Sequence, residues 1–140
     1  MERSLQIGDR FGFSRRMTSE IHQAFLVCSG DVNPLHVDDD HARALGHPGK
    51  LMHGALLNAM VSGFVGTGLP VSDTLCLSQK LDFRRPFFLD DLVELQATVS
   101  ALQPAPFADK LVAEFALSFS VSGRVIATGS VEVLMGVSKE

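Results

Sequence analysis

A carboxylate and an imidazole stand five residues apart in the segment GDVNPLH, as Asp31 and His36. The dipeptide Asn33-Pro34 lies between them, and it favours a turn and disfavours an α-helix. An acid–base pair on one stiff loop can hold a single water molecule and move its protons. Taken alone, the motif is equally compatible with a plain turn that carries a surface histidine.

Three flanking features favour the catalytic interpretation. First, His53-Gly54 begins a long apolar segment, and a backbone amide at a helix start can receive negative charge that develops on an oxygen. Second, the surroundings are apolar, which desolvates the pair. Third, the second half of the chain supplies the sheet that such a helix needs. These are the parts required to add water to, or remove it from, a thioester-activated double bond.

The length and composition indicate one domain over residues 1–140. Hydrophobic residues make up 46% of the chain and charged residues 20%, which suits a packed core and argues against disorder. The net charge of −4 argues against nucleic-acid binding.

We expect neither a secretory signal nor a membrane span in this sequence. Its N-terminal segment has neither an apolar stretch nor a cleavage-site pattern. The apolar segment 54–70 is short for a membrane span and is interrupted by glycines and polar residues, so we expect a core helix. Cys28 and Cys76 lie in apolar contexts and are expected to be small buried side chains in a reducing compartment. These features predict a cytoplasmic protein that does not bind membranes.

The first half of the chain carries helix signals. The patterns predict a strand or hairpin arm over 10–17 and helices over 20–27, 41–45 and 53–66. Thr18 offers an N-cap to the first helix, and Gly30 stops it. The acidic run 38–40 suits the start of the second helix, and Gly46 suits its end.

The second half of the chain is predicted to be β. Residues 110–121 alternate between apolar and polar side chains, and Ser122-Gly123 suits a two-residue hairpin turn. Further strands are expected over 75–85, 92–103 and 125–135. Four long strands after one buried helix predict an α+β fold in which a curved antiparallel sheet wraps around a long central helix.

These motifs together resemble the MaoC-like, or hydratase 2, family. The matching blocks are GDVNPLHVD (30–38), Ala42, Gly46, HG (53–54), GTGLP (66–70), LSQ (77–79) and FRRP (83–86). The resemblance implies a hot-dog fold, a homodimer and an (R)-specific enoyl-CoA hydratase of the short type that feeds polyhydroxyalkanoate synthesis. That activity interconverts trans-2-enoyl-CoA and (R)-3-hydroxyacyl-CoA in fatty acid metabolism and uses no cofactor. Asn58 and Val71 depart from the family pattern, and both bear on the acyl pocket.

The same resemblance assigns the central roles. Asp31 and His36 hold the water that is added at the β-carbon. The backbone amide of Gly54 receives the thioester oxygen, and Asn33 braces the loop. Ser62 lies two helical turns beyond Gly54 and is expected to support the pair; alternatively, its hydroxyl bonds back to its own helix.

Two further sets are expected to bind substrate. Val65 and Leu69 lie further along the long helix, in the direction that the acyl tail could run. Arg84 and Arg85 suit the phosphates of coenzyme A, because the guanidinium fork matches phosphate oxygens. A solvated strand end is the alternative interpretation of this arginine pair.

Other functions receive less support from the sequence. The histidines at 36, 41, 47 and 53 show no zinc-binding spacing, so no metal is expected. The nearest rivals are a dehydratase of acyl carrier protein thioesters or of short or branched 3-hydroxyacyl-CoA, and a hot-dog acyl-CoA thioesterase. A non-catalytic acyl-CoA binder is disfavoured, since it does not need the intact water-holding pair.

Overall fold

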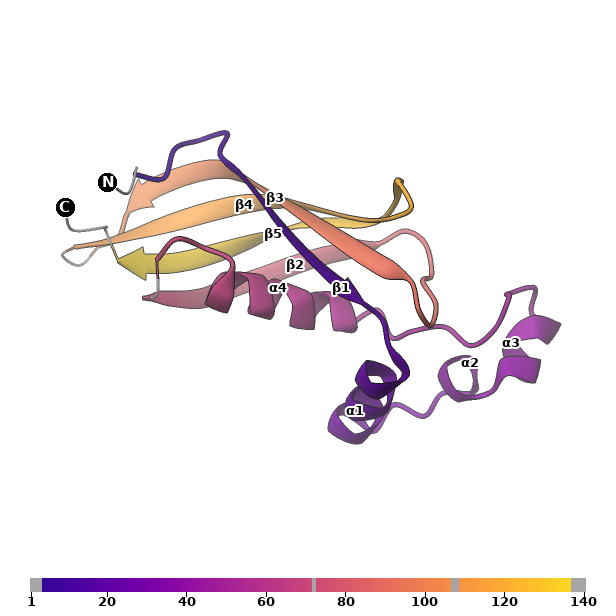
Figure 1. Ribbon diagram of the computed structural model, residues 1–140. Helices are drawn as coiled ribbons and strands as arrows, with labels where there is room; N and C mark the ends of the chain where they lie inside the picture. The colour runs from indigo at the N-terminus through magenta and orange to yellow at the C-terminus, as the bar shows by residue number, and fades with distance from the viewer. Residues whose placement is uncertain (1–3, 72, 107–108, 137–140) are drawn as a thin grey trace.

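The structure is a computed structural model that describes residues 4–71, 73–106 and 109–136. Its elements follow in the order β1 (Arg10–Arg16), α1 (Ser19–Ser29), α2 (Pro34–Val37), α3 (Asp39–Ala44), α4 (Leu56–Thr67), β2 (Thr74–Phe83), β3 (Leu92–Pro104), β4 (Lys110–Val121) and β5 (Arg124–Gly136). Helix α4 lies along one face of the sheet, and α1, α2 and α3 gather beyond one end of it (Figure 1).

The five strands form one antiparallel sheet in the order β1-β3-β4-β5-β2. The four long consecutive strands expected from the sequence are therefore confirmed. Ser122 and Gly123 both adopt positive φ, as a tight hairpin turn between β4 and β5 requires. Strands β1 and β2 form the two edges of the sheet.

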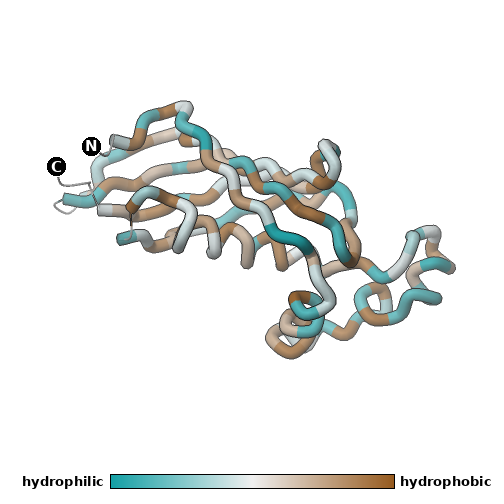
Figure 2. The backbone as a smooth tube through the Cα atoms, viewed as in Figure 1, coloured by the Kyte–Doolittle hydropathy of each residue, from teal (hydrophilic) through white to brown (hydrophobic). Residues whose placement is uncertain are grey.

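Apolar side chains fill the space between α4 and the sheet. The alternation expected over 110–121 is confirmed, since Ala113, Phe115, Leu117 and Phe119 of β4 are buried. In α4, the buried side chains are Leu56, Leu57, Met60, Val61, Phe64 and Val65. Apolar and polar residues alternate along the strands in Figure 2. The sheet thus encloses one side of α4, as the small and apolar residues of that segment predict.

The helix caps agree with the sequence for α1 and α3. The Thr18 hydroxyl accepts a hydrogen bond from the Ile21 amide at 3.2 Å, and Gly30 ends α1 with a φ of 70°. The Asp38 carboxylate accepts from the amides of Asp40 and His41 at the start of α3. These bonds satisfy amides that a helix start leaves unpaired.

Three expectations need correction. The segment after Asn33 is a short helix, α2, because proline is well suited to a first helical position and the Asn33 side chain caps the Leu35 amide. Helix α4 begins at Leu56 rather than His53, since residues 54–55 form a turn. Cys28 is exposed on α1 rather than buried, and Cys76 is only partly buried. Among the described residues, no helix is long and apolar enough to cross a membrane.

Candidate active site

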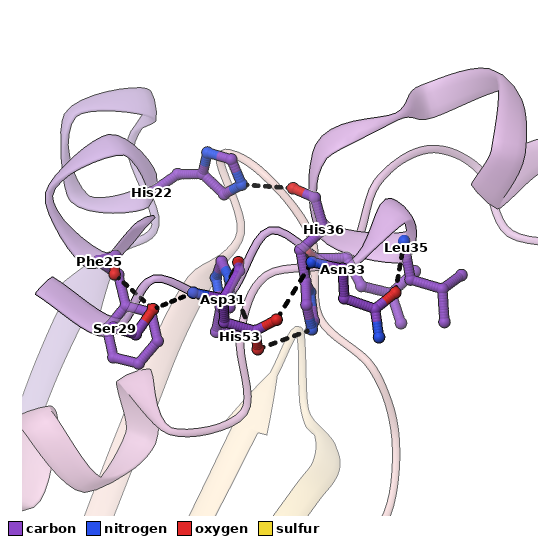
Figure 3. A network of polar contacts seen from close by, with 9 residues as sticks. His22, Phe25, Ser29, Asp31, Asn33, Leu35, His36 and His53 are labelled. Carbon is purple, nitrogen blue, oxygen red and sulfur yellow. Dashed lines mark hydrogen bonds and ion pairs between the residues drawn. The ribbon is translucent and has the colours of Figure 1, made fainter. Parts of the chain in front are cut away.

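Asp31 and His36 come together as the sequence predicts. The His36 Nε2 atom lies 3.8 Å from Asp31 Oδ2, and the two side chains retain 17% and 46% exposure. This separation is too long for a direct hydrogen bond and suits two groups that share one small molecule. Figure 3 shows both side chains in one polar network with His22 and His53.

Local hydrogen bonds fix the loop between the pair. The Asp31 carboxylate accepts from the Asn33 amide at 3.2 Å, and the Asn33 side chain accepts from the Leu35 amide at 3.0 Å. The Asp31 amide donates to the Ser29 hydroxyl, which ties the loop to the end of α1. Asn33 therefore caps α2 within this loop, although its own side chain is exposed.

One hydrogen bond determines which nitrogen of His36 is basic. His36 Nδ1 lies 2.9 Å from the Leu51 carbonyl oxygen. A carbonyl only accepts hydrogen bonds, so Nδ1 carries the proton, and the neutral ring offers its lone pair at Nε2. The basic nitrogen of His36 thus faces the Asp31 carboxylate.

His53 belongs to the predicted His-Gly motif, and its side chain also contacts Asp31 and His36. Its ring is 2% exposed, and its Nε2 atom donates to the Asp31 carbonyl oxygen at 2.9 Å. It stacks on His36 with ring centroids 4.0 Å apart, and Phe25 lies 4.7 Å away. Burial lowers the pKa of His53, the adjacent His36 ring adds to that effect, and the Asp31 carbonyl opposes it. The buried Nδ1 atom has no hydrogen-bond partner in the described parts of the chain, which also fits a neutral ring.

His22 was not predicted to belong to the site. Its ring is 4% exposed, and Nε2 lies 2.7 Å from the His36 carbonyl oxygen. The available signal was helical spacing, because His22, Phe25 and Ser29 lie at positions i, i+3 and i+7 of α1 and share one face. All three contact the segments that carry Asp31, His36 or His53.

Nitrogen and oxygen atoms of Asp31, His36 and His53 all lie within 4.8 Å of one another, so a metal ion must be considered. The two imidazole planes are inclined by only 23° and are stacked. A metal binds in the plane of each ring at about 2.0–2.1 Å, which two stacked rings cannot offer to one ion. The Nε2 proton of His53 is also directed at a carbonyl. This arrangement favours proton transfer over metal binding.

Gly54 occupies the turn that leads into α4, directly after His53. A side chain at this position would come within 3.3 Å of the Phe83 ring, so glycine permits the close approach of β2. The carbonyls of His53 and Gly54 accept from the amides of Leu56 and Leu57. The amide of Gly54 thus lies just before the first hydrogen-bonded turn of α4.

The remaining predicted residues lie on or just after α4 and just after β2. Ser62 is exposed on α4, and no contact joins it to Asp31 or His36 within the described residues. Val65 and Leu69 are buried in the core. Arg84 and Arg85 are exposed after β2, and Arg84 donates to the Thr128 hydroxyl at 3.2 Å. The roles assigned to these residues stay predictions. The unusual Asn58 donates to the Gln79 side chain at 2.9 Å.

An apolar hollow lies between β1 and α4. Its volume is about 370 Å³, and its lining includes Phe13, Ile21, Leu56, Met60 and Gly63. The hollow also borders α1 through Ile21, which precedes His22, and it reaches the start of α4 through Leu56.

Comparison with known proteins identifies the family. The profile of the MaoC like domain matches residues 4–114. The chain belongs to the MaoC-like family. An (R)-specific enoyl-CoA hydratase from Aeromonas caviae is 33% identical over 131 residues, which are 93% of this chain and 95% of that protein. A mitochondrial 3-hydroxyacyl-[acyl-carrier-protein] dehydratase from Arabidopsis thaliana is 32% identical over 111 residues, or 79% of this chain and 64% of that protein.

The solved structure of the (R)-hydratase from A. caviae involved in PHA biosynthesis matches with a TM-score of 0.82. The match has 32% identity and covers 94% of this chain and 98% of that one. The predicted MaoC-like membership and hot-dog fold are therefore confirmed. The MaoC-like chain is a hydratase or dehydratase of acyl thioesters.

Proposed function

We propose that this MaoC-like protein catalyses the reversible hydration of trans-2-enoyl-CoA to (R)-3-hydroxyacyl-CoA without a cofactor. The observation that carries the proposal is the orientation of His36. Its Nδ1 proton is held by the Leu51 carbonyl, so the basic Nε2 atom faces the Asp31 carboxylate at 3.8 Å. The (R)-specific hydratase from A. caviae supports the same reaction.

Asp31 and His36, which together form the dyad, are suited to activating one water molecule. The Asp31 carboxylate and the His36 Nε2 lone pair are both acceptors, so a shared water donates one hydrogen to each. The pair takes one proton as the water oxygen bonds to the β-carbon, and it returns one proton to the α-carbon. The proton count of the pair is unchanged after each turnover. Both proton transfers are therefore assigned to the pair and not to either residue alone.

The substrate thioester is expected to lie against the start of α4. The Gly54 amide would donate to the thioester oxygen as it becomes enolate-like, and such donors stabilise the developing charge. Arg84 and Arg85 are exposed and available to the phosphates of coenzyme A. Ser62 would support the pair, and the acyl tail would run along α4 past Val65 and Leu69.

The acyl route can be tested by enlarging residues on α4. Val65→Phe should shift preference toward shorter enoyl-CoAs by about 10-fold or more, as one pocket contact does. Gly63→Val is the matched variant, because its side chain would meet Phe13 in the apolar hollow. Rates with C4 to C12 enoyl-CoAs decide whether the acyl tail runs past Val65 or occupies the apolar hollow. A shift in the Gly63 variant alone would mean that the tail occupies the hollow.

The reaction itself is tested by a spectrophotometric assay of C4 to C12 enoyl-CoAs with simultaneous thiol detection. The proposal predicts loss of the enoyl absorbance without thiol release, and chiral analysis should give the (R)-3-hydroxyacyl product. Thiol release would instead identify a thioesterase. Faster turnover of the same acyl group on acyl carrier protein, or of short or branched 3-hydroxyacyl-CoA, would favour the dehydratase alternative.

We also propose that the protein is a homodimer. Strand β2 is an edge of the sheet, and it carries Leu75 and Leu77 with 59% and 48% exposure. An exposed apolar edge strand is a ready site for pairing with a second chain. Light scattering at assay concentration should give twice the chain mass of 15.1 kDa. An active monomer at that concentration would contradict the proposed homodimer.

A further inference from the structure

We infer that His22, which lies outside the catalytic motif, is a positioning residue for the dyad and acts by holding the backbone of His36. This inference rests on the proposed hydration activity. His22 and His53 are the two buried polar side chains among the described residues. A buried polar group in a small domain is expected to have a specific partner, since an unpaired one is costly.

The partner of His22 is the catalytic residue itself. Its Nε2 atom lies 2.7 Å from the His36 carbonyl oxygen, across 14 residues of sequence. Since a carbonyl only accepts, Nε2 of His22 donates a proton to that bond. The bond therefore links α1 directly to the main chain of the catalytic histidine, as Figure 3 shows.

This carbonyl needs an outside donor because α2 is so short. The last four carbonyls of any helix lack a partner within it, and α2 contains four residues. The Pro34 carbonyl accepts from the Asp38 amide, and the Leu35 carbonyl accepts from the Leu51 amide. The His36 carbonyl is satisfied by His22. An apolar residue at position 22 can fill the same space but leaves this carbonyl unpaired.

With His22 in place, His36 is held at three points. Its amide donates to the Asn33 carbonyl, its carbonyl accepts from His22, and its Nδ1 atom donates to Leu51. The direction of the basic Nε2 atom follows from these bonds. The Asp31 carbonyl is held in a parallel way by His53. Each member of the dyad is thus anchored through its own backbone by a buried imidazole.

The inference predicts a specific rescue pattern. His22→Leu removes the donor, and we expect kcat for crotonyl-CoA to fall about 10- to 100-fold, the range expected for small misplacement of a catalytic group. KM should change by less than about 3-fold, since His22 is buried behind the dyad. His22→Gln should restore kcat to within about 3-fold of wild type, because the glutamine amide can reach the His36 carbonyl. His22→Asn is the matched control, as it carries the same amide one carbon short.

Two further measurements complete the experiment. His41→Leu, at an exposed histidine of α3, should leave kcat unchanged and controls for loss of an imidazole. Nitrogen-detected NMR of the imidazoles should show a slowly exchanging Nε2 proton on His22 and an Nδ1 proton on His36. In His22→Leu the His36 ring signals should shift, and in His22→Gln they should stay near those of wild type.

The outcomes separate this inference from the proposed function. Full kcat in folded His22→Leu, or equal loss in the leucine and glutamine variants, would overturn the positioning role. If wild type hydrates none of the enoyl-CoAs, the proposed function fails, and the inference is then decided by NMR alone. Identical His36 signals in wild type and His22→Leu would overturn it in that case.

Discussion

The two ends of this molecule are stabilised by different kinds of contact. In the sheet and helix core, aromatic rings such as Phe64 and Phe115 pack edge to face with centroids 5.5 Å apart and are fully buried. At the end formed by α1, α2 and α3, the backbone carbonyls of Asp31, His36 and Leu51 each accept a hydrogen bond from a histidine ring. Packing dominates one end, and directed polar contacts dominate the other.

This difference has consequences for mutation. Core contacts are numerous, and each contributes a small part of the free energy of unfolding. Loss of one side chain therefore lowers stability in proportion to the volume removed. A backbone carbonyl that accepts from a single histidine ring has no other donor to replace it. Loss of that ring therefore displaces the one residue that carries the carbonyl. Changes in the core should therefore alter the free energy of unfolding, and changes at the histidine-bearing end should alter turnover.

The largest effect is expected at the dyad. Asp31→Ala and His36→Ala should each lower the hydration rate by about 10²–10⁴-fold, the range typical of acid–base groups. The urea midpoint should change little, because Asp31 is 46% exposed and neither residue belongs to the apolar core. Steady-state kinetics with crotonyl-CoA, together with urea unfolding, provide the comparison. A large loss of stability in these variants would contradict this distinction between the two ends.

The reverse result is expected in the core. Phe115→Ala should lower the free energy of unfolding by about 3–5 kcal/mol, since a large buried side chain is lost and a cavity remains. The kcat per folded molecule should stay within a few-fold of wild type. Urea unfolding and active-site titration of the folded fraction are the measurements. A large loss of kcat at unchanged stability would show that the core and the dyad are coupled.

Gly54 lies where the two ends meet, and it should show an intermediate effect. Gly54→Val should obstruct approach to the backbone amide and lower turnover by about 10²–10³-fold, which is typical for loss of an oxyanion donor. The fold should survive, because the added atoms meet the ring of Phe83, whose side chain is exposed and free to turn. Gly66→Val, on the helix that follows Gly54, is the control, since no atom lies within 4 Å of its added Cβ. Equal losses in both variants would indicate a helix effect instead.

The core was the more predictable of the two ends. Alternation along 110–121 and the glycine turn at 122–123 are local signals, and they correctly indicated the strands and their hairpin. Burial of the apolar segment after Gly54 followed from its composition. The order β1-β3-β4-β5-β2 was not predicted, because strand order depends on contacts between residues far apart in the chain.

The site was predictable only in part. The pairing of Asp31 with His36 could be predicted because both lie within one short motif. His22 and the side chain of His53 were missed, since they come from α1 and from the segment before α4 and meet the dyad only in the folded chain. Helix α2 was missed because proline was interpreted as a helix breaker, although the first helical position accepts it.

The smallest effect is expected from the titration of His53. Burial lowers its pKa in the folded protein below the ordinary value of 6.5, so the unfolded chain binds this proton more readily. The free energy of unfolding should therefore decrease as the pH falls below 6.5, by at most about 1.4 kcal/mol per pH unit for this one proton. Urea unfolding at pH 7 and pH 5 measures the slope. His53→Gln should flatten it, and His41→Gln should not; an unchanged slope in His53→Gln would contradict the assignment.

The central claim is that Asp31 and His36 act on one shared water molecule. A kinetic double-mutant cycle with Asp31→Ala, His36→Ala and the double variant tests it most directly, with crotonyl-CoA hydration as the readout. Residues that act as a unit show strongly non-additive losses. We predict that the double variant is little slower than the slower single variant. Losses that multiply across the cycle would mean that the two side chains act independently, and would contradict the shared-water mechanism.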